Sequence, residues 1–161
     1  MKKIIISLLF PCLLWSQAPI LEATKLIEAK SYQQAELKLK AYLLENPNNQ
    51  EALELYGDAL GYQKKWDDAI QTYKSLVSAQ SENANYQYKY GGALAMKALS
   101  VNKLRAAVII IDAKNAFLKA ADLDPNHIDV RWALVELYMQ LPGILGGSKN
   151  KSLVYAEELD A

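Results

Sequence analysis

The 161-residue sequence has one cysteine and one histidine, and it is poor in glycine and proline, with seven and five residues. One cysteine cannot form an internal disulfide, and with one histidine it cannot supply the four ligands of a structural zinc site. So little glycine and proline excludes a collagen-like or low-complexity chain. An excess of one charge is also missing: 18 basic residues balance 18 acidic ones, which argues against a broad nucleic-acid surface. The 52% of hydrophobic residues instead predicts a folded domain with a buried core.

The first 18 residues have the layout of a secretory signal peptide. Two lysines form a positive head, the apolar run Ile4–Trp15 follows, and Ser16 and Ala18 are small residues suited to a cleavage site. The apolar run has 12 residues, fewer than the roughly 20 that a membrane-spanning helix needs. We therefore predict export through a cleaved signal peptide, residues 1–18, and a periplasmic location.

Cys12 leaves a lipid-anchored form as a weaker alternative, because bacterial lipid-attachment motifs end in cysteine. The residue before it should be small, however, and here it is Pro11. An uncleaved start that tethers the chain to a membrane is the other alternative. Cleavage near Ala18 would remove the only cysteine and both leading lysines, which leaves 16 basic against 18 acidic residues.

Small residues recur at a period of 34 in the rest of the chain. Ala23, Gly57 and Gly91 are 34 residues apart, and so are Tyr32 and Trp66. A fixed period of this length is the signature of a repeat architecture. Each repeat has two stretches in which apolar residues recur every three or four positions, which predicts two helices per repeat.

The third repeat is ten residues longer than the second. Ala69 and Ala113 are 44 residues apart, and so are Gly91 and Val135. The β-branched run Val108–Ile111 lies in this longer repeat and is compatible with a strand. A lone strand would have no partner, so a longer helix or a packed hairpin is the stronger interpretation.

These features resemble the tetratricopeptide repeat family. The matching residues are small where helices approach, aromatic where successive pairs meet, or prolines that stop a helix: Ala23, Gly57, Gly91, Ala35, Ala69, Ala113, Tyr73, Phe117, Pro47 and Pro125. The resemblance implies an all-α, right-handed α-solenoid of about four helix-turn-helix repeats, the third with a ten-residue insertion. It covers residues 19–140 well and 141–161 more loosely. The expected repeats are residues 19–49, 50–83, 84–127 and 128–161.

The fourth repeat departs from the pattern after its first helix. Its glycine-rich segment Gly143–Lys149 lacks the Gly-Lys-Ser/Thr order of a phosphate-binding loop. We therefore interpret the segment as a helix–helix connector whose glycines permit a sharp turn with positive φ. Ser148 is expected to cap a degenerate second helix that runs to Leu159.

No combination of residues predicts catalysis. His127, the only imidazole, follows Asp124-Pro125-Asn126 at an expected helix start, so a surface or capping role is expected. The carboxylates Asp67, Asp68 and Asp122 lie at helix ends, where they complement the helix dipole. We expect a protein that is not an enzyme, with no cofactor, no metal and no small-molecule substrate.

The resemblance implies that a partner binds on the concave face, which the first helix of each repeat lines. Tyr62, Tyr88 and Trp132 are the expected anchors, because aromatic side chains dominate interface energies. Helical spacing adds polar groups, and the predicted partner-binding set is Glu54, Asp58, Tyr62, Asn85, Tyr88, Trp132 and Glu136. Burial of the aromatic rings by the insertion or by a neighbouring repeat is the alternative.

The polar residues on this face indicate the kind of partner. Some members of the family bind chaperone carboxyl termini with Lys, Arg and Asn, whereas this face is acidic, with only Lys89 nearby. An acidic, tyrosine-rich face favours a basic or mixed amphipathic protein segment, and no nucleic acid. We expect a scaffold that binds such a segment, with a permanent structural subunit of a bacterial envelope assembly complex as the alternative.

Overall fold

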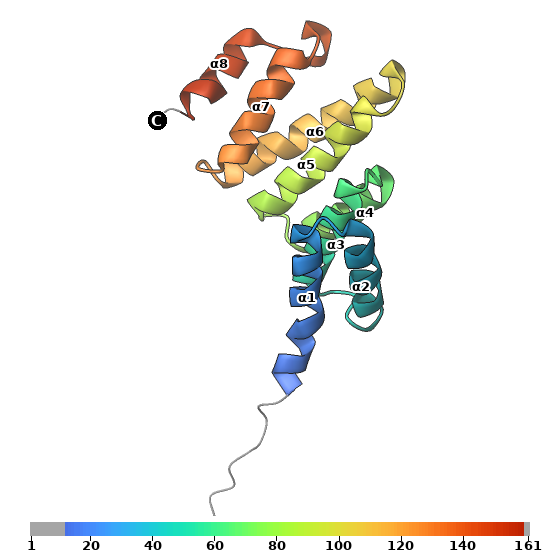
Figure 1. Cartoon of the computed structure of the whole chain (residues 1–161). Coiled ribbons are helices and arrows are strands. Elements are labelled where there is room, and N and C mark those ends of the chain that lie inside the picture. The colour runs from blue at the N-terminus through green and yellow to red at the C-terminus, as the bar shows by residue number, and fades with distance from the viewer. Residues whose placement is uncertain (1–11, 160–161) are drawn as a thin grey trace, which may run out of the picture.

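The computed structural model describes residues 12–159, with side chains from residue 18 onward. Eight α-helices follow one another (Figure 1): α1 (Cys12–Glu28), α2 (Tyr32–Glu45), α3 (Gln50–Tyr62), α4 (Trp66–Ala79), α5 (Ala84–Leu99), α6 (Lys103–Leu123), α7 (Ile128–Gln140) and α8 (Lys149–Glu157). A short 3-10 helix, η1 (Gly143–Leu145), lies between α7 and α8. Residues 12–159 contain no strand. Most of the expected signal peptide lies outside the described residues.

The helices pack as consecutive pairs, and the pairs stack along the molecule from α1–α2 to α7–α8 (Figure 1). Each helix contacts the next in sequence, and α1 also touches α3, as α5 touches α7. The chain is therefore an all-α solenoid, as predicted. The first helices of the second, third and fourth pairs begin at Gln50, Ala84 and Ile128, where the period places them.

The ten extra residues of the third repeat lengthen both of its helices. α5 has 16 residues where α3 has 13, and α6 has 21 where α4 has 14. The turns inside the two pairs are equally long, at residues 63–65 and 100–102. Val108–Ile111 lies within α6, so the longer helix is confirmed among the three interpretations. None of the described helices, α6 included, combines the length and apolar character that crossing a membrane would require.

Asparagine side chains fix the start of three helices. Asn49 and Asn83, one period apart, cap α3 and α5, and Asn102 caps α6. Each side-chain oxygen accepts the backbone N–H three residues later, at 2.9–3.1 Å. The first amides of a helix have no partner inside it, so such a cap contributes about 1 kcal/mol. His127 precedes α7 but makes no side-chain cap bond, so the expected capping role is not seen.

Left-handed residues end the first helices of the first two pairs. Lys30 and Lys64, one period apart, have φ values of 58° and 60°. The residue after each donates its N–H to the carbonyl five residues earlier, at 2.8 and 3.0 Å. This is the Schellman ending of a helix. The turn after α5 differs, because Val101, the residue that corresponds to Lys64, has no positive φ.

Two glycines let the helices of a pair approach closely. A Cβ atom added to Gly57 would lie 2.6 Å from the ring of Tyr73, and one added to Gly91 would lie 2.9 Å from the ring of Phe117. Both rings are buried in the core of their repeats. The predicted pairing of a small residue with an aromatic one is therefore confirmed in the second and third repeats.

A glycine-rich connector joins the last two helices, as predicted. Gly146 has a φ of 92°, which is the expected positive value. Gly147 has no positive φ; instead, an added Cβ atom would overlap the carbonyl oxygen of Leu141. Ser148 then caps α8, and α8 packs on α7. The expected second helix of the fourth repeat is therefore present.

Candidate functional site

The predicted binding residues lie on the first helices of the second, third and fourth pairs. By helix they are Glu54, Asp58 and Tyr62 on α3, Asn85 and Tyr88 on α5, and Trp132 and Glu136 on α7. Spacings of three and four residues put the members of each helix on one side of it. We call the surface that these three sets form the first-helix face.

Lys89 links α5 to α3 on the first-helix face. Its Nζ atom lies 2.8 Å from Oε1 of Glu54 and 2.6 Å from Oδ2 of Asp58. Asn85 also donates to Oε1 of Glu54 at 2.8 Å, and the Tyr73 hydroxyl donates to Oδ1 of Asp58 at 2.6 Å. The protein itself therefore supplies partners to both carboxylates. Lys89 therefore offsets one of the two negative charges and reduces the acidic character expected of this part of the face.

The pKa values in this cluster are those of a fixed ion pair. Burial is the largest single influence and would lower the pKa of Lys89, but the charges and hydrogen bonds of Asp58 and Glu54 together outweigh it, so the pKa is raised. The pKa of the Tyr73 hydroxyl is raised strongly, first by burial and then by the charge of Asp58. Both groups hold their protons at neutral pH, so the cluster joins α3 to α5 and is not poised for proton transfer.

Tyr88 is half-buried on α5. Its ring centroid lies 6.1 Å from that of Phe117 and 5.1 Å from that of His127, which precedes α7. Burial and then the charge of Asp129 raise the pKa of its hydroxyl. Side chains of α6 and of the loop before α7 therefore cover part of this ring, so Tyr88 is less available to a partner than expected.

Tyr62 and Trp132 remain open to solvent, with 60% and 56% of their surface exposed. The Tyr62 ring stacks on Tyr32 of the first repeat, with centroids 4.5 Å apart and planes inclined by 16°. Trp132 is followed at spacings of four and three residues by Glu136 and Met139, both exposed. α7 therefore presents an exposed row that is apolar at both ends and acidic in the middle.

Gly92 leaves the middle of the first-helix face open. It holds on α5 the position that Asp58 holds on α3, one period earlier, and no heavy atom lies within 4 Å of an added Cβ atom. Met96, one turn further along α5, is exposed. The adjacent Gly91 faces α6, so the two glycines have opposite surroundings. The described residues contain no group of three His, Cys, Asp or Glu that could hold a metal ion.

Comparison with known proteins identifies the repeats. Residues 26–92 match the family model described as tetratricopeptide repeat. These residues are tetratricopeptide (TPR) repeats, and the helices that the structure describes have the fold of TPR proteins. No curated protein matches the sequence.

Solved structures share this TPR fold at low sequence identity. TTC0263, a thermophilic TPR protein in Thermus thermophilus, gives a TM-score of 0.75 at 17% identity, over 89% of this chain and 72% of that one. MamA, from residue 41 to its end, of Desulfovibrio magneticus RS-1 gives 0.68 at 21% identity, over 90% and 72%. Structural matches at identities this low show a shared fold and do not identify a binding partner.

The sequence pattern did not assign Lys89 or Tyr73 to the first-helix face. For Lys89 the reason is the axial offset between α3 and α5. Lys89 was only a neighbouring cation in the sequence, and Tyr73 only a core residue. The contacting pairs Glu54–Asn85 and Asp58–Lys89 are each 31 residues apart, which is one period less about one helical turn. This offset, applied to the two carboxylates, would have predicted both contacts.

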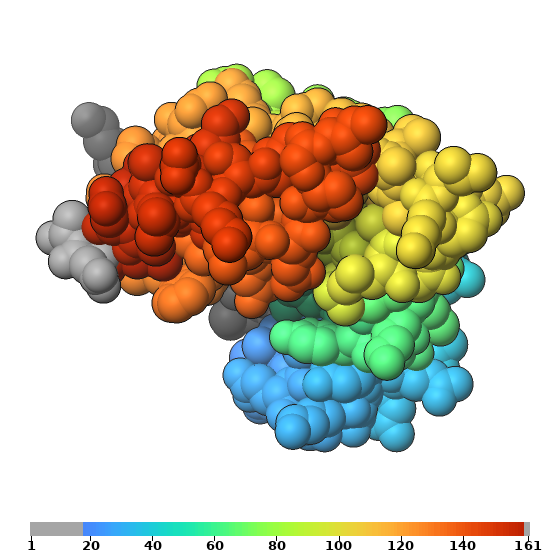
Figure 2. All heavy atoms as spheres, turned by 90° about the horizontal axis from the view of Figure 1, so that it is seen from above, coloured from blue at the N-terminus to red at the C-terminus, as the bar shows by residue number. Residues whose placement is uncertain are grey.

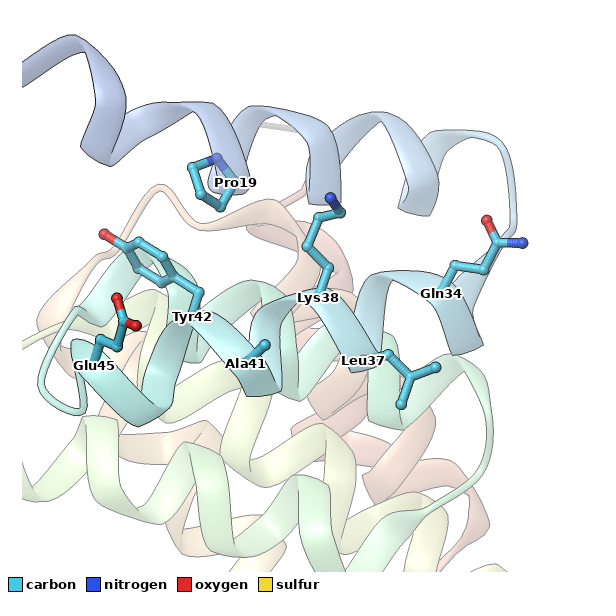
Figure 3. Close-up of a pocket in the computed structure, with 7 residues that line it drawn as sticks. All are labelled: Pro19, Gln34, Leu37, Lys38, Ala41, Tyr42 and Glu45. Atoms are coloured by element: carbon cyan, nitrogen blue, oxygen red, sulfur yellow. The ribbon is translucent and has the colours of Figure 1, made fainter.

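An open hollow lies elsewhere on the molecule, between α1 and α2 (Figure 3). Pro19 projects from α1 toward α2, and Lys38 and Tyr42 project from α2 toward α1. Exposed Leu37 and Glu45 also line it. The hollow mixes apolar and charged side chains and includes none of the predicted binding residues.

Proposed function

We propose that this protein is a non-catalytic scaffold that binds an extended peptide or protein segment on its first-helix face. The TPR fold supports this proposal, because proteins of this fold are generally interaction scaffolds. The observation that carries it is the exposure of Tyr62 and Trp132 on a face that Gly92 leaves open at its middle. Exposed aromatic side chains are the usual centres of protein-binding surfaces.

The charges of the first-helix face define the chemistry of the proposed partner. Because Lys89 already pairs with both Glu54 and Asp58 on α3, the carboxylates with no such partner are on α7, at Asp129 and Glu136, which are both exposed. The partner segment would place an apolar or aromatic side chain against Trp132 and a Lys or Arg beside these carboxylates. Exposed ion pairs contribute at most about 1 kcal/mol each, so the apolar contact supplies most of the affinity.

Photo-crosslinking tests this proposal directly. A benzoylphenylalanine residue replaces Trp132 in one sample and Lys74, which is exposed on α4, in the matched control. In extracts of the source cells we expect one dominant adduct from position 132, mapped to a segment with an apolar residue near a Lys or Arg. The same adducts from position 74 would contradict binding at the first-helix face.

A permanent subunit of an envelope assembly complex is the second candidate function. Leu37 and Leu44 favour it, because both are largely exposed on α2, away from the first-helix face. Size-exclusion chromatography of the purified chain separates the two candidates. A scaffold should elute as a single stable species, whereas a permanent subunit should aggregate or unfold without its complex.

We further propose export and cleavage near Ala18, which gives a periplasmic protein. Supporting this, the side chain of Ala18 is exposed. Cleavage there would leave Pro19 in the first turn of the helix, where proline is well tolerated. Mass spectrometry of the protein from its source should find an amino terminus near Pro19, and a retained Met1 would refute cleavage.

A further inference from the structure

The lengthened helix α6 carries a row of exposed apolar side chains. Leu104, Val108 and Ile111 are 86%, 67% and 44% exposed, and Leu99 at the end of α5 is 74% exposed. We call these four residues the α6 stripe. Figure 2 shows this part of the chain, in yellow, projecting at one side of the molecule. The stripe belongs to the repeat that is ten residues longer than the others, so the period of 34 does not account for it.

The stripe lies on the side of α6 that faces away from the core. Spacings of four and three residues put Leu104, Val108 and Ile111 on one side of the helix. The buried side of α6 includes Ala113 and Phe117. Leu104 and Ala113 are nine residues apart, which is about two and a half turns, so they point in opposite directions. A helix that is apolar on two opposite sides is expected to be covered on both, yet no described residue covers the stripe.

The surroundings of the stripe are positively charged. No Asp or Glu occurs from residue 83 to residue 111, and Asp112 is the first that follows. Lys89 and Lys97 are held by carboxylates on α3 and α4. Lys103 and Arg105, on either side of Leu104, are exposed and make no ion pair with any described residue.

We propose that the α6 stripe docks on the surface of a lipid bilayer that contains anionic lipids. Leu104 and Val108 would enter the boundary between headgroups and acyl chains. Lys103 and Arg105, about 100° to either side of Leu104 around the helix, would extend to the lipid phosphates. α5 and α7 contact the opposite, buried side of α6, so docking would leave the first-helix face free for a partner.

A second copy of this chain matches the stripe less well. A two-fold contact centred on Leu104 would bring Lys103 and Arg105 of both copies together, and Asp112, the first acidic residue that follows in the sequence, lies about two helical turns from Leu104. Anionic lipids supply the missing negative charge. A bilayer surface also accepts projecting Leu and Val side chains without a preformed pocket. Apolar residues flanked by Lys and Arg are the pattern of helices that lie in a membrane interface.

The test measures the environment of the stripe itself. In the full chain, Cys12→Ser removes the only cysteine, and Val108→Cys introduces one that carries a polarity-sensitive NBD fluorophore. A local probe is needed because the apolar run Ile4–Trp15 can attach the whole chain to vesicles. The matched control carries the same probe at Lys74→Cys on α4. The vesicles are phosphatidylcholine alone, or phosphatidylcholine with an equal part of phosphatidylglycerol.

With the mixed vesicles we expect a blue shift at position 108 and no change at position 74. Each Lys or Arg near an anionic surface contributes about five-fold in binding, so adding Lys103→Glu and Arg105→Glu should weaken the response about thirty-fold or more. Circular dichroism should be unchanged, because all the substituted residues with described side chains are exposed.

The proposal would be overturned by no shift with either vesicle, by an equal shift at position 74, by an equal shift on phosphatidylcholine alone, or by a concentration-dependent shift without lipid. The last outcome would assign the stripe to a second copy of the chain. A response to vesicles that survives both charge reversals would equally exclude recognition of anionic lipid.

Discussion

Two junctions on the first-helix face share one period but differ in chemistry. Where α3 meets α5, Glu54 and Asp58 are bound by Lys89, so these charges satisfy one another. One period later, the residues at the two acidic positions are Tyr88 and Gly92. The junction of α5 with α7 is therefore aromatic and partly open, whereas the junction of α3 with α5 is polar and closed by its own contacts.

Part of this difference comes from one hydroxyl group. Tyr73 and Phe117 fill equivalent places in their repeats, beside Gly57 and Gly91. Only Tyr73 has a hydroxyl to donate to Asp58, at 2.6 Å. The core keeps its small and aromatic residues in both repeats, while the residues that face outward change. The period thus maintains the fold, and departures from it indicate where binding is expected.

Removing the ring of the third repeat should have the largest effect on stability. Phe117→Ala should lower the free energy of unfolding by about 3–5 kcal/mol, because the buried ring packs among residues of α6 and α7. Urea denaturation followed by circular dichroism measures the change. Leu104→Ala, on the opposite side of the same helix, should change it by less than about 0.5 kcal/mol. Equal effects would contradict the assignment of the two sides.

The adjacent glycines of α5 should respond in opposite directions to the same substitution. Gly91→Ala should cost about 1–3 kcal/mol of stability, because its Cβ atom would meet the Phe117 ring at 2.9 Å. Gly92→Ala should stabilise the protein by up to about 1 kcal/mol, because alanine favours the helix and meets no atom within 4 Å. Thermal melting of both variants tests this, and a matching loss for Gly92→Ala would show that the face is closed there.

Alkaline pH should weaken the polar junction. Lys89 and Tyr73 have raised pKa values in the folded protein, so the unfolded chain loses their protons first. The free energy of unfolding therefore keeps their full contribution below about pH 10. Above about pH 10 it falls, by up to about 1.4 kcal/mol per pH unit for each group. In denaturant titrations across this range, Tyr73→Phe should show a shallower fall. An identical slope would mean that the Tyr73 hydroxyl is not held neutral.

Glycine substitutions in the turns between paired helices should have the smallest effect on stability. Lys64→Gly should stabilise the protein by up to about 1 kcal/mol, because glycine adopts the φ of 60° without strain. Val101→Gly, at the corresponding position of the third repeat, should give no such gain, because Val101 has no positive φ. Melting temperatures of the two variants distinguish the turns, and an equal gain would contradict the difference between them.

Much of the fold could be predicted because the packing demands recur at a fixed interval. Positions 57 and 91 require glycine because an aromatic ring packs against the helix at each of them. This requirement recurs with the period and is therefore visible in the sequence. The run Val108–Ile111 was ambiguous because a short β-branched segment fits a strand as well as a buried helix. Its place within 21 residues free of Gly and Pro explains why the helix continues through it.

The candidate site was harder to predict because its contacts depend on how successive pairs are offset. Helical spacing assigned Glu54 and Asp58 to the first-helix face, but not the approach of Lys89 from the next repeat. Tyr88 is covered by His127, which belongs to the loop before α7. Neither contact follows from the pattern of one repeat alone.

The most direct test of the central claim is the crosslinking yield at Trp132 when the middle of the first-helix face is filled. Gly92→Trp places a large side chain in the open space, and Lys74→Trp is the control on α4. We predict that Gly92→Trp lowers the yield of the dominant adduct by about ten-fold or more, equivalent to about 1.4 kcal/mol, while Lys74→Trp leaves it unchanged. An undiminished yield with Gly92→Trp in a folded protein would contradict binding across this face.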